Sequence, residues 1–556
     1  MNANIMLLLA GTVLVVCCQM GFFQLESGFV HVKNTGSILI KNLVNLCITY
    51  LAFMFLGFGV MFGRGNGFFG WLDPFSLGDY ASVLPAGVPS DMFVIYYGAC
   101  CASVGSIAAG AMSGRNRFAA HCAICFFIAL FVYPVVGRWT ADGWLSQLGF
   151  EDFCGAGAIH LTAGVASAVG AGYIGPRLGK YSEDGKPKAM PGHSVAQSGA
   201  GTFILWACWF GFAAGAVAAM PGDEAPKLFA KLFFNLNIAA AASACAALTF
   251  IWIRYPKPDI SMTMNGLLAG LVGVSSGAAS VNALGAAAIG VCCGLCSVAA
   301  IEFIETRARI DDPCGAISVH GVCALLGILL TGVFSAENGL FYGRGAARIG
   351  VQFLGAAAVS VWVAFTMTAV LFVLNKYVGL RVAPRDEING LDAAEHGLAM
   401  LYAEAMADSL IDYQGEGKNQ TGNPSNKIPE LKKPSSVRKI TKVEILMRQT
   451  RFESLKEAMN EIGVTGVTVT QALGCGMQKG NREYYRGIER EMTLLPKIRV
   501  EIVVTKVPAS LVIDTARKVL YTGHIGDGKI FVYDVEDVIK VRTGETGYDA
   551  LQGVDE

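Results

Sequence analysis

The sequence predicts a polytopic α-helical membrane protein with a small soluble α/β domain at its C-terminal end. Of its 556 residues, 53% are hydrophobic and 15% are charged, and the mean hydropathy is +0.48. Residues 1–375 hold 18 Lys and Arg and 17 Asp and Glu, whereas the remaining 181 residues hold 25 and 26. This composition excludes a disordered chain and a simple soluble enzyme, because soluble proteins carry about 25% charged residues. The net charge of zero gives no basic excess that would indicate binding of nucleic acid.

Eleven apolar runs in the first part of the chain are each close to the ~20 residues that a helix needs to cross a bilayer. The runs are 5–27, 43–63, 92–112, 119–137, 155–175, 196–219, 228–252, 261–280, 283–304, 315–335 and 346–375. The first run could be a signal peptide, but it lacks a basic flank and ends in polar residues such as Gln24 and Glu26, so we expect a true span. Gly and Ala are frequent, for example in 266–290, which predicts a tightly packed bundle.

The loops between these runs predict the orientation. One alternate set of loops holds 12 Lys and Arg and the other set holds 6. Because the set richer in Lys and Arg stays in the cytoplasm, we expect the N-terminus outside and the C-terminal domain in the cytoplasm. The predicted location is the cytoplasmic (inner) membrane, with lipid around a multi-pass protein.

Ionisable residues inside the apolar runs are candidates for function, because a charge at membrane depth is costly. Asp152 and His160 lie eight residues, or ~12 Å of helix, apart, so that Asp152 is near the mouth and His160 near the middle of the membrane. His320 lies just inside another apolar run. Two neutral imidazoles in a narrow apolar pore could pass or share a proton. The alternative is that each histidine is a packing residue with satisfied hydrogen bonds.

The 16 cysteines form no disulfide framework and no zinc-binding spacing, and we interpret them as small apolar packing residues. We expect no redox cofactor.

Several motifs of the apolar part resemble the ammonium transporters of the Amt family. They are the stretches 20–45, 57–71, 311–323 and 391–397, and the resemblance covers about residues 5–400. It implies eleven helices with one pore in each subunit, three subunits in the assembly, and a pair of histidines that corresponds to His160 and His320. It also implies that Asp152 supports the entry site for ammonium.

The resemblance implies further pore residues, some of which depart from the family pattern. The outer indole falls on Trp139, which could instead be an aromatic residue of the membrane interface. The second of two stacked gate rings falls on Phe212, beside Trp209. The first gate position is Cys100, and a serine that usually helps to bind the ion is replaced by Ala216. These two departures bear on high-affinity recruitment and on the double gate.

The charged C-terminal part divides into four segments. Residues 376–412 resemble the Amt cytoplasmic tail, 413–439 have the composition of a flexible linker, and 552–556 form a short end. Within 440–551 we expect strands at 441–447, 466–474, 497–505 and 530–535, helices at 452–462 and 509–521, and a long loop at 475–493. This βαββαβ order predicts a ferredoxin-like fold.

The loops of this domain resemble a PII nitrogen-signalling protein (GlnK/GlnB-like) in 476–489, 494–504 and 522–532. The resemblance implies a homotrimer that binds ATP or ADP between subunits and 2-oxoglutarate beside Mg-ATP. The implied nucleotide-binding residues are Thr468, Gly523, Gly526, Asp527, Gly528, Lys529, Lys540 and Arg542. The implied 2-oxoglutarate residues are Gln478, Lys479, Gly480 and Lys497, and Gln478 would also ligate Mg²⁺. Lys529 and Arg542 could alternatively be solvated charges.

Two departures from the PII pattern concern ligands and modification. Met477 stands at the position of a phosphate-binding arginine, so nucleotide affinity is expected to differ. Arg490 stands at the position of the tyrosine that is uridylylated in some PII proteins, so that modification is not expected.

The two resemblances together imply a channel with its own regulator. PII proteins close ammonium channels by inserting the long loop into the cytoplasmic mouth, and the inserted arginine corresponds to Arg486. We therefore predict ammonium transport regulated by an attached PII domain through a contact within the trimer. The alternative is an ammonium sensor that conducts little and signals through the PII domain. Enzymatic activity is not expected, because no nucleophile and base stand together in the sequence.

Overall fold

The computed structural model describes residues 3–85, 88–218, 225–398, 439–447, 451–464, 466–474, 483–486, 488–490, 495–523 and 527–551. The chain divides into two compact units. The helical unit comprises residues 1–411 together with the short segment 484–489, and the sheet unit comprises 412–483 and 490–556. The predicted linker 413–439, apart from Lys439, and the end 552–556 lie outside the described residues.

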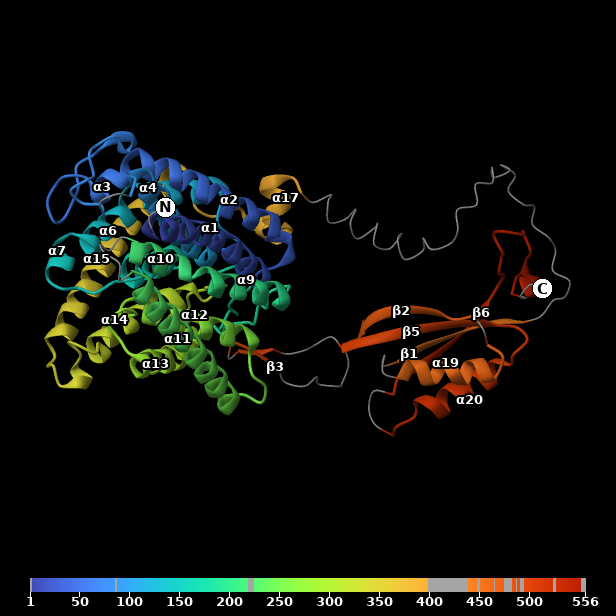
Figure 1. The fold of residues 1–556 in the computed structure, drawn as a ribbon. Coiled ribbons are helices and arrows are strands. Elements are labelled where there is room, and N and C mark those ends of the chain that lie inside the picture. Colours follow the sequence, from blue (N-terminus) through green and yellow to red (C-terminus); the bar gives the residue numbers. More distant parts are fainter. Residues whose placement is uncertain are drawn as a thin grey trace. The chain divides into compact units, whose positions relative to one another are not determined.

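The helical unit is a bundle of membrane-length apolar helices (Figure 1). Its spans are α1 Ala3–Phe29; α2 Thr35–Ala52 with η2 Phe53–Gly57 and α3 Phe58–Phe62; α4 Ser90–Ala111; α5 Phe118–Phe127 with η4 Ile128–Val132 and α6 Tyr133–Ala141; η5 Ala156–Leu161 with α8 Thr162–Ile174; α9 Val195–Cys208 with α10 Phe210–Ala218; α11 Ala225–Arg254; α12 Ile260–Ser275; α13 Ala283–Phe303 with η6 Ile304–Ala308; η7 Ile317–Val322 with α14 Cys323–Phe334; and α15 Ala347–Tyr377. In the described part of the chain, ten of these are long enough to cross a membrane, and α12 is a shorter apolar helix. The eleven predicted runs therefore each correspond to a helix.

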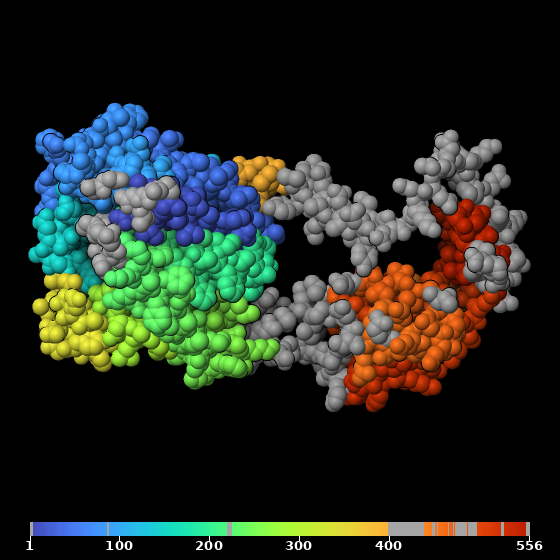
Figure 2. All heavy atoms as spheres, viewed as in Figure 1, coloured from blue at the N-terminus to red at the C-terminus, as the bar shows by residue number. Residues whose placement is uncertain are grey.

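Small residues allow these helices to pack closely. Gly270 and Gly290 each face the carbonyl oxygen of Ala239 on α11, where an added Cβ would lie 2.4 Å from that oxygen. This contact brings the backbones of α11, α12 and α13 together, as small residues do at helix interfaces in lipid. Segments from the beginning, middle and end of the helical unit, coloured blue, green and yellow, share one face of it (Figure 2).

Two short helices after α15 are fixed to the bundle by acidic side chains. In α17 (Leu391–His396), the carboxylate of Asp392 accepts hydrogen bonds from the backbone N–H groups of Gly36 and Ser37, at 2.9 and 2.7 Å. In α16 (Pro384–Asn389), Glu387 accepts a hydrogen bond from the N–H of Leu178. The described part of segment 376–412 is thus ordered against the loops of the bundle.

The sheet unit contains the predicted βαββαβ succession. Its elements are β1 Ile440–Met447, α19 Phe452–Glu461, β2 Thr468–Gly474, β5 Leu495–Val504, α20 Ala509–Leu520, β6 Lys529–Val535 and the short α21 Gly547–Ala550. The sheet has the order β2-β5-β1-β6 with antiparallel neighbours. Buried residues of the strands, such as Val443 and Ile502, pack against Leu455 and Val512 of the helices. The sheet unit therefore has its own hydrophobic core.

The long loop differs from its prediction. Its described part contains two three-residue strands, β3 Glu483–Tyr485 and β4 Ile488–Arg490, which pair with each other. Arg486 occupies the turn between them with a left-handed φ of 51°. A side chain at such a φ costs about 1–2 kcal/mol, which the turn must offset through other contacts.

Candidate functional site

Two histidines meet in the interior of the helical unit. His160 belongs to η5 and His320 to η7, and their Nδ1 atoms are 3.2 Å apart. The two side chains are 0% and 5% exposed, so the contact is shielded from solvent. One imidazole must donate and the other accept at this distance, so the pair can hold a shared proton between the rings.

Both histidines lie in π-helical turns, with one extra residue per turn relative to an α-helix. The two turns, η5 and η7, each span six residues and continue into α-helices. Turns of this kind are rare and frequently occur at functional sites.

Aromatic rings enclose His160. The ring of Trp209 stacks on it with 4.7 Å between centroids, and Phe212 meets it edge-on at 5.9 Å. The indole N–H of Trp209 donates to Ser275 Oγ at 3.2 Å, which fixes the orientation of the ring. Within the described residues, Nε2 of His160 has no hydrogen-bond partner. This nitrogen is therefore available to a small polar molecule.

A carboxylate begins each of the two histidine-bearing helices. Asp152 accepts hydrogen bonds from the N–H groups of Gly157 and Ala158 at 2.9 and 2.8 Å. Asp312 accepts from Gly315 and Ile317 at 3.0 and 2.7 Å. Both aspartates satisfy amides that an unbonded helix start would leave without partners. They also place a negative charge eight residues before a histidine in both cases.

The residue before each aspartate is also acidic and forms an ion pair. Glu151 pairs with Arg348 at 2.9 Å, and Asp311 pairs with Arg177 at 2.8 Å. Burial alone would raise the pKa of Asp311, but the Arg177 guanidinium overcomes this effect and holds the pKa well below its usual range. Arg115, fully buried, donates to the Asp311 carbonyl at 2.7 Å. The start of η7 is therefore held by a buried network of charges.

A vestibule of about 300 Å³ opens beside Asp152. It is lined by 21 residues, which include Tyr97, Cys100, Asp152, Phe212 and Ala216. The structure thus brings four of the predicted pore residues to one cavity: Asp152, Cys100, Phe212 and Ala216. Tyr97 packs against Phe62, with 4.9 Å between ring centroids, and supplies a further aromatic face.

Trp139, the predicted outer indole, packs among other aromatic residues. It is 7% exposed, its indole N–H donates to the Phe68 carbonyl at 3.0 Å, and its ring packs against Trp144 and Trp362. The described lining of the vestibule includes its neighbours Thr140 and Asp142 but not Trp139. The Trp139 side chain thus lies in an aromatic cluster, next to the turn of the chain that lines the vestibule.

A second, smaller cavity lies beside His320 and shares no lining residue with the vestibule. Its volume is about 30 Å³, and Glu26, Ser106 and Asn265 are among its lining residues. None of these three was expected to take part in the site.

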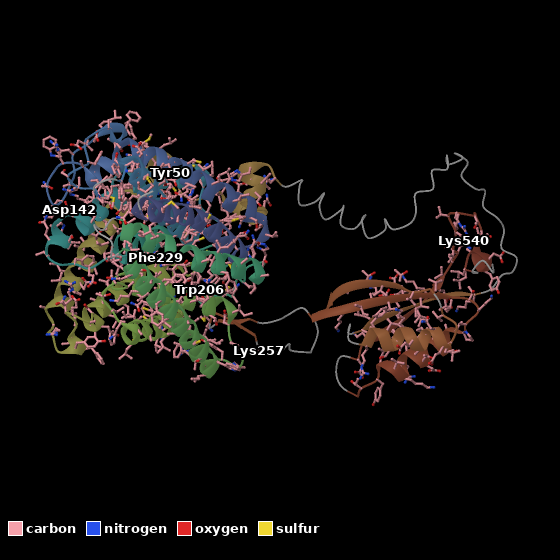
Figure 3. The ribbon with its side chains drawn as sticks, in the orientation of Figure 1. Tyr50, Asp142, Trp206, Phe229, Lys257 and Lys540 are labelled. Carbon is pink, nitrogen blue, oxygen red and sulfur yellow. The ribbon has the colours of Figure 1, made fainter. Side chains whose placement is uncertain are left out.

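The segment 484–489 contributes an arginine to the helical unit. The backbone N–H of Arg486 donates to Asp259 Oδ2 at 2.7 Å, and its Nη1 donates to the carbonyl oxygen of Asp312 at 2.9 Å. The guanidinium lies 5.2 Å from the centre of the Phe29 ring, and the side chain is 1% exposed. Asp142, beside the vestibule, and Lys257, two residues before Asp259, are at opposite ends of the helical unit (Figure 3). Arg486 thus lies at the end remote from the vestibule.

The predicted ligand residues of the sheet unit fall into two separate hollows. One is lined by Asp527, Gly528 and Lys529 together with residues of α20, and the other by Thr468, Lys540 and Arg542. Gly523 lies near the first group, since its N–H donates to Asp527 Oδ2. Lys497 is half-buried on β5. Gln478, Lys479, Gly480 and Gly526 lie outside the described residues.

Comparisons with known proteins agree with this architecture. The family model described as Ammonium Transporter Family matches residues 5–401. The chain belongs to the ammonium transporter family. A second family model, Nitrogen regulatory protein P-II, matches residues 440–545, so this transporter-family chain carries a P-II domain at its C-terminal end.

Individual relatives cover the transporter part. The chain is 34% identical over 408 residues to ammonium transporter Amt2 of Archaeoglobus fulgidus, which covers 69% of this chain and 85% of the relative. It is 33% identical over 436 residues to Amt2 of Haloferax mediterranei, covering 75% and 94%. Among solved structures, a sensor Amt protein is 32% identical with a TM-score of 0.67 and covers 71% of this chain and 98% of that one. Mep2 of Saccharomyces cerevisiae is 26% identical with a TM-score of 0.61 over 68% of this chain and 87% of that one.

The sequence alone did not identify two residues of the helical unit that belong to the candidate site, Asp312 and Asp259. The signal for Asp312 was present, because its eight-residue spacing to His320 repeats that of Asp152 to His160. Asp259 caps α12, where its Oδ1 accepts a hydrogen bond from Met262 N–H at the start of the helix. Only the fold shows its second oxygen bonded to Arg486.

Proposed function

We propose that this protein conducts ammonium across the membrane through the pore that contains His160 and His320, and that its P-II domain regulates this conduction. The observation that carries the proposal is the buried 3.2 Å contact between the Nδ1 atoms of the two histidines. A paired imidazole in an apolar interior can take a proton from ammonium and share it, while uncharged ammonia crosses the apolar surroundings.

Ammonium would enter through the vestibule beside Asp152. A hydrated cation that enters the 300 Å³ vestibule meets the carboxylate of Asp152 and the aromatic faces of Tyr97 and Phe212. The carboxylate acts mainly at a distance, because its oxygens already accept the two amides of η5. The aromatic faces would each favour a cation by about 0.5–2 kcal/mol. Nε2 of His160 would then accept the first hydrogen bond from the substrate inside the pore.

The P-II domain would bind ATP or ADP, with 2-oxoglutarate bound beside Mg-ATP. Support comes from the two hollows, because Lys529 and Gly528 line one, while Lys540 and Arg542 line the other. Two half-sites on one domain suit a nucleotide held between two copies in a homotrimer. Exposed apolar residues on β6, such as Val532 and Tyr533, are available to such a contact. Gln478 would hold Mg²⁺, and Lys497 the carboxylate of 2-oxoglutarate.

Arg486 would be the valve. Its support is the set of contacts with Asp259, Asp312 and Phe29, in which a permanently charged guanidinium occupies a buried position. Covalent attachment gives the loop an effective concentration of roughly millimolar for a short flexible linker. ADP would favour the inserted loop, and Mg-ATP with 2-oxoglutarate would favour its withdrawal. A shift from 99% closed to 99% open requires about 5.5 kcal/mol of differential ligand binding.

The experiment measures ammonium-evoked current in proteoliposomes that contain the full chain. We expect current with Mg-ATP and 2-oxoglutarate, inhibition by ADP, and loss of that inhibition in Arg486→Ala. The matched control is Arg385→Ala, which removes an exposed arginine of α16. Equal inhibition of wild type and Arg486→Ala, or inhibition of neither, would contradict the valve.

A second candidate function is an ammonium sensor with little conduction. Cys100 and Ala216 favour it, because both line the vestibule where the family pattern has a gate ring and an ion-binding serine. The similarity to a solved sensor Amt protein also favours it. Ammonium that changes nucleotide binding by the full chain, in the absence of any evoked current, would support sensing over transport.

A further inference from the structure

The small cavity beside His320 is suited to hold water. Its volume of about 30 Å³ exceeds the 10–15 Å³ that one water molecule needs. Most of its lining is apolar, but four polar side chains reach it: Glu26, Ser106, Asn265 and His320. A dry cavity is expected only where the walls are apolar throughout, so these polar groups favour ordered water.

Asn265 gives an independent indication of a polar occupant. Its side chain is 1% exposed, and its Nδ2 has no hydrogen-bond partner within the described part of the chain. Leaving a buried amide donor unsatisfied costs about 1–3 kcal/mol. A water molecule in the cavity removes this cost.

Glu26 is a buried carboxyl group with unused acceptor capacity. Its side chain is 3% exposed; Ser113 Oγ donates to one carboxylate oxygen at 2.8 Å, and Asn42 Nδ2 donates to the other at 3.1 Å. A carboxylate offers about four acceptor positions, so two remain. Titratable groups near it in the described part of the chain include Lys41 of α2, together with Cys314 and His320, which line the same cavity. The Lys41 ammonium is directed to the carbonyl of Asn116 at 2.6 Å.

His320 contacts His160 and also lines the cavity that Glu26 lines. Its Nδ1 faces Nδ1 of His160, so its Nε2 is the nitrogen left for the cavity that the ring lines. A water molecule in the cavity would therefore occupy a space that both His320 and Glu26 line. Glu26 is also a candidate for function because an ionisable side chain within a membrane-spanning helix is costly to bury.

We propose that Glu26 is the proton acceptor of the histidine pair, reached through water in this cavity. The inference rests on the proposed transport function. Ammonium gives one proton to the histidine pair and continues as ammonia. The proton then passes from His320 to the cavity water and on to the Glu26 carboxylate, which becomes a carboxylic acid. Glu26 later releases the proton past Ser113, so that one positive charge crosses for each ammonia and no other bond changes.

The test uses the full chain on an Arg486→Ala background, in proteoliposomes with a pH-sensitive dye inside. Glu26→Gln keeps the size of the side chain and one of its two acceptor oxygens, but its amide cannot take a proton. We expect its ammonium-evoked current to fall at least tenfold. The lumen should become more alkaline than with the parent protein, because ammonia enters without its proton and takes one up inside. Glu26→Asp should retain part of the current, and Thr12→Val, elsewhere on α1, should behave like the parent.

A current within twofold of the parent in Glu26→Gln would overturn the relay alone. Loss of both current and alkalinisation in Glu26→Gln, with recovery of neither in Glu26→Asp, would show a packing role and also overturn it. Absence of current in the parent protein would overturn the transport function on which the relay depends. Infrared difference spectroscopy gives a second readout: ammonium should produce a carboxylic acid C=O band in the parent that Glu26→Gln lacks, and an identical band in both would refute the proposal.

Discussion

Two segments of the helical unit, 151–160 and 311–320, have the same design but different surroundings. Each has two consecutive acidic residues, followed eight residues after the second by a histidine in a π-helical turn. They belong to the fifth and tenth predicted spans, which cross the membrane in opposite directions. Two spans of opposite direction thus bring their histidines together, as in the inverted repeats of many transporters.

The difference lies in what covers each helix start. Asp152 faces an open vestibule, whereas the carbonyl of Asp312 accepts a bond from Arg486. The Glu151–Arg348 pair is partly exposed, at 14% and 24%, while the Asp311–Arg177 pair is 0% and 9% exposed. In the proposed function, the same local arrangement serves ammonium entry at Asp152 and control of conduction at Asp312, because its neighbours differ.

The two segments share a histidine, and removing either histidine should have the largest effect on the ammonium-evoked current. We expect His160→Ala and His320→Ala each to abolish the ammonium-evoked current or to change its ion selectivity. The current would be measured in proteoliposomes with ammonium, potassium and sodium. His193→Ala, outside the pore, is the control. Unchanged, ammonium-selective flux in both pore variants would refute the twin-histidine pore.

The acidic residues that precede the aspartates should differ in their contribution to stability. Asp311→Asn breaks a buried ion pair and should cost about 3–5 kcal/mol. Glu151→Gln breaks a partly exposed pair and should cost about 1 kcal/mol or less. Thermal unfolding in detergent measures both, and equal losses would contradict the asymmetry.

The Asp311 effect should also depend on pH. The folded-state pKa is held below the unfolded value of about 3.9, so the stabilisation is fully present above that value and is lost as pH falls toward the folded pKa. The difference between wild type and Asp311→Asn should therefore be constant near neutral pH and shrink below about pH 4.

A substitution of Asp259 should change the contacts of Arg486 near Asp312 without changing the vestibule near Asp152. Asp259→Asn retains a good helix-capping residue for α12 but removes the charge next to Arg486. We expect inhibition by ADP to weaken several-fold with little change in the uninhibited current. Dose–response curves for ADP measure this, and Asp152→Asn should instead change the ammonium dependence. If Asp259→Asn leaves the ADP response unaltered, its contact with Arg486 has no regulatory role.

A substitution in the vestibule wall, at Ala216, should have the smallest effect on the ammonium-evoked current. Ala216→Ser adds a hydroxyl to the vestibule wall, where one hydrogen bond is worth about 0.5–1.5 kcal/mol. The ammonium concentration for half-maximal current should fall about two- to tenfold. Ala214→Ser on the same helix is the matched control, since Ala214 does not line the vestibule among the described residues. A rise in the half-saturating concentration would contradict the proposed entry site.

The sequence by itself determined the eleven apolar helices, because bilayer thickness fixes the length of each apolar run. It also determined the order of the strands and helices in the sheet unit, because strand and helix periodicities differ. It also identified His160 and His320 through their motifs. Tertiary structure alone decided which residues meet. The indole of Trp139 packs in an aromatic cluster, and the predicted ligand residues of the P-II domain line two separate hollows. Glu26 and Asn265, 239 positions apart, reach one cavity. Such contacts depend on how helices pack and rotate, and no local pattern of residues records that rotation.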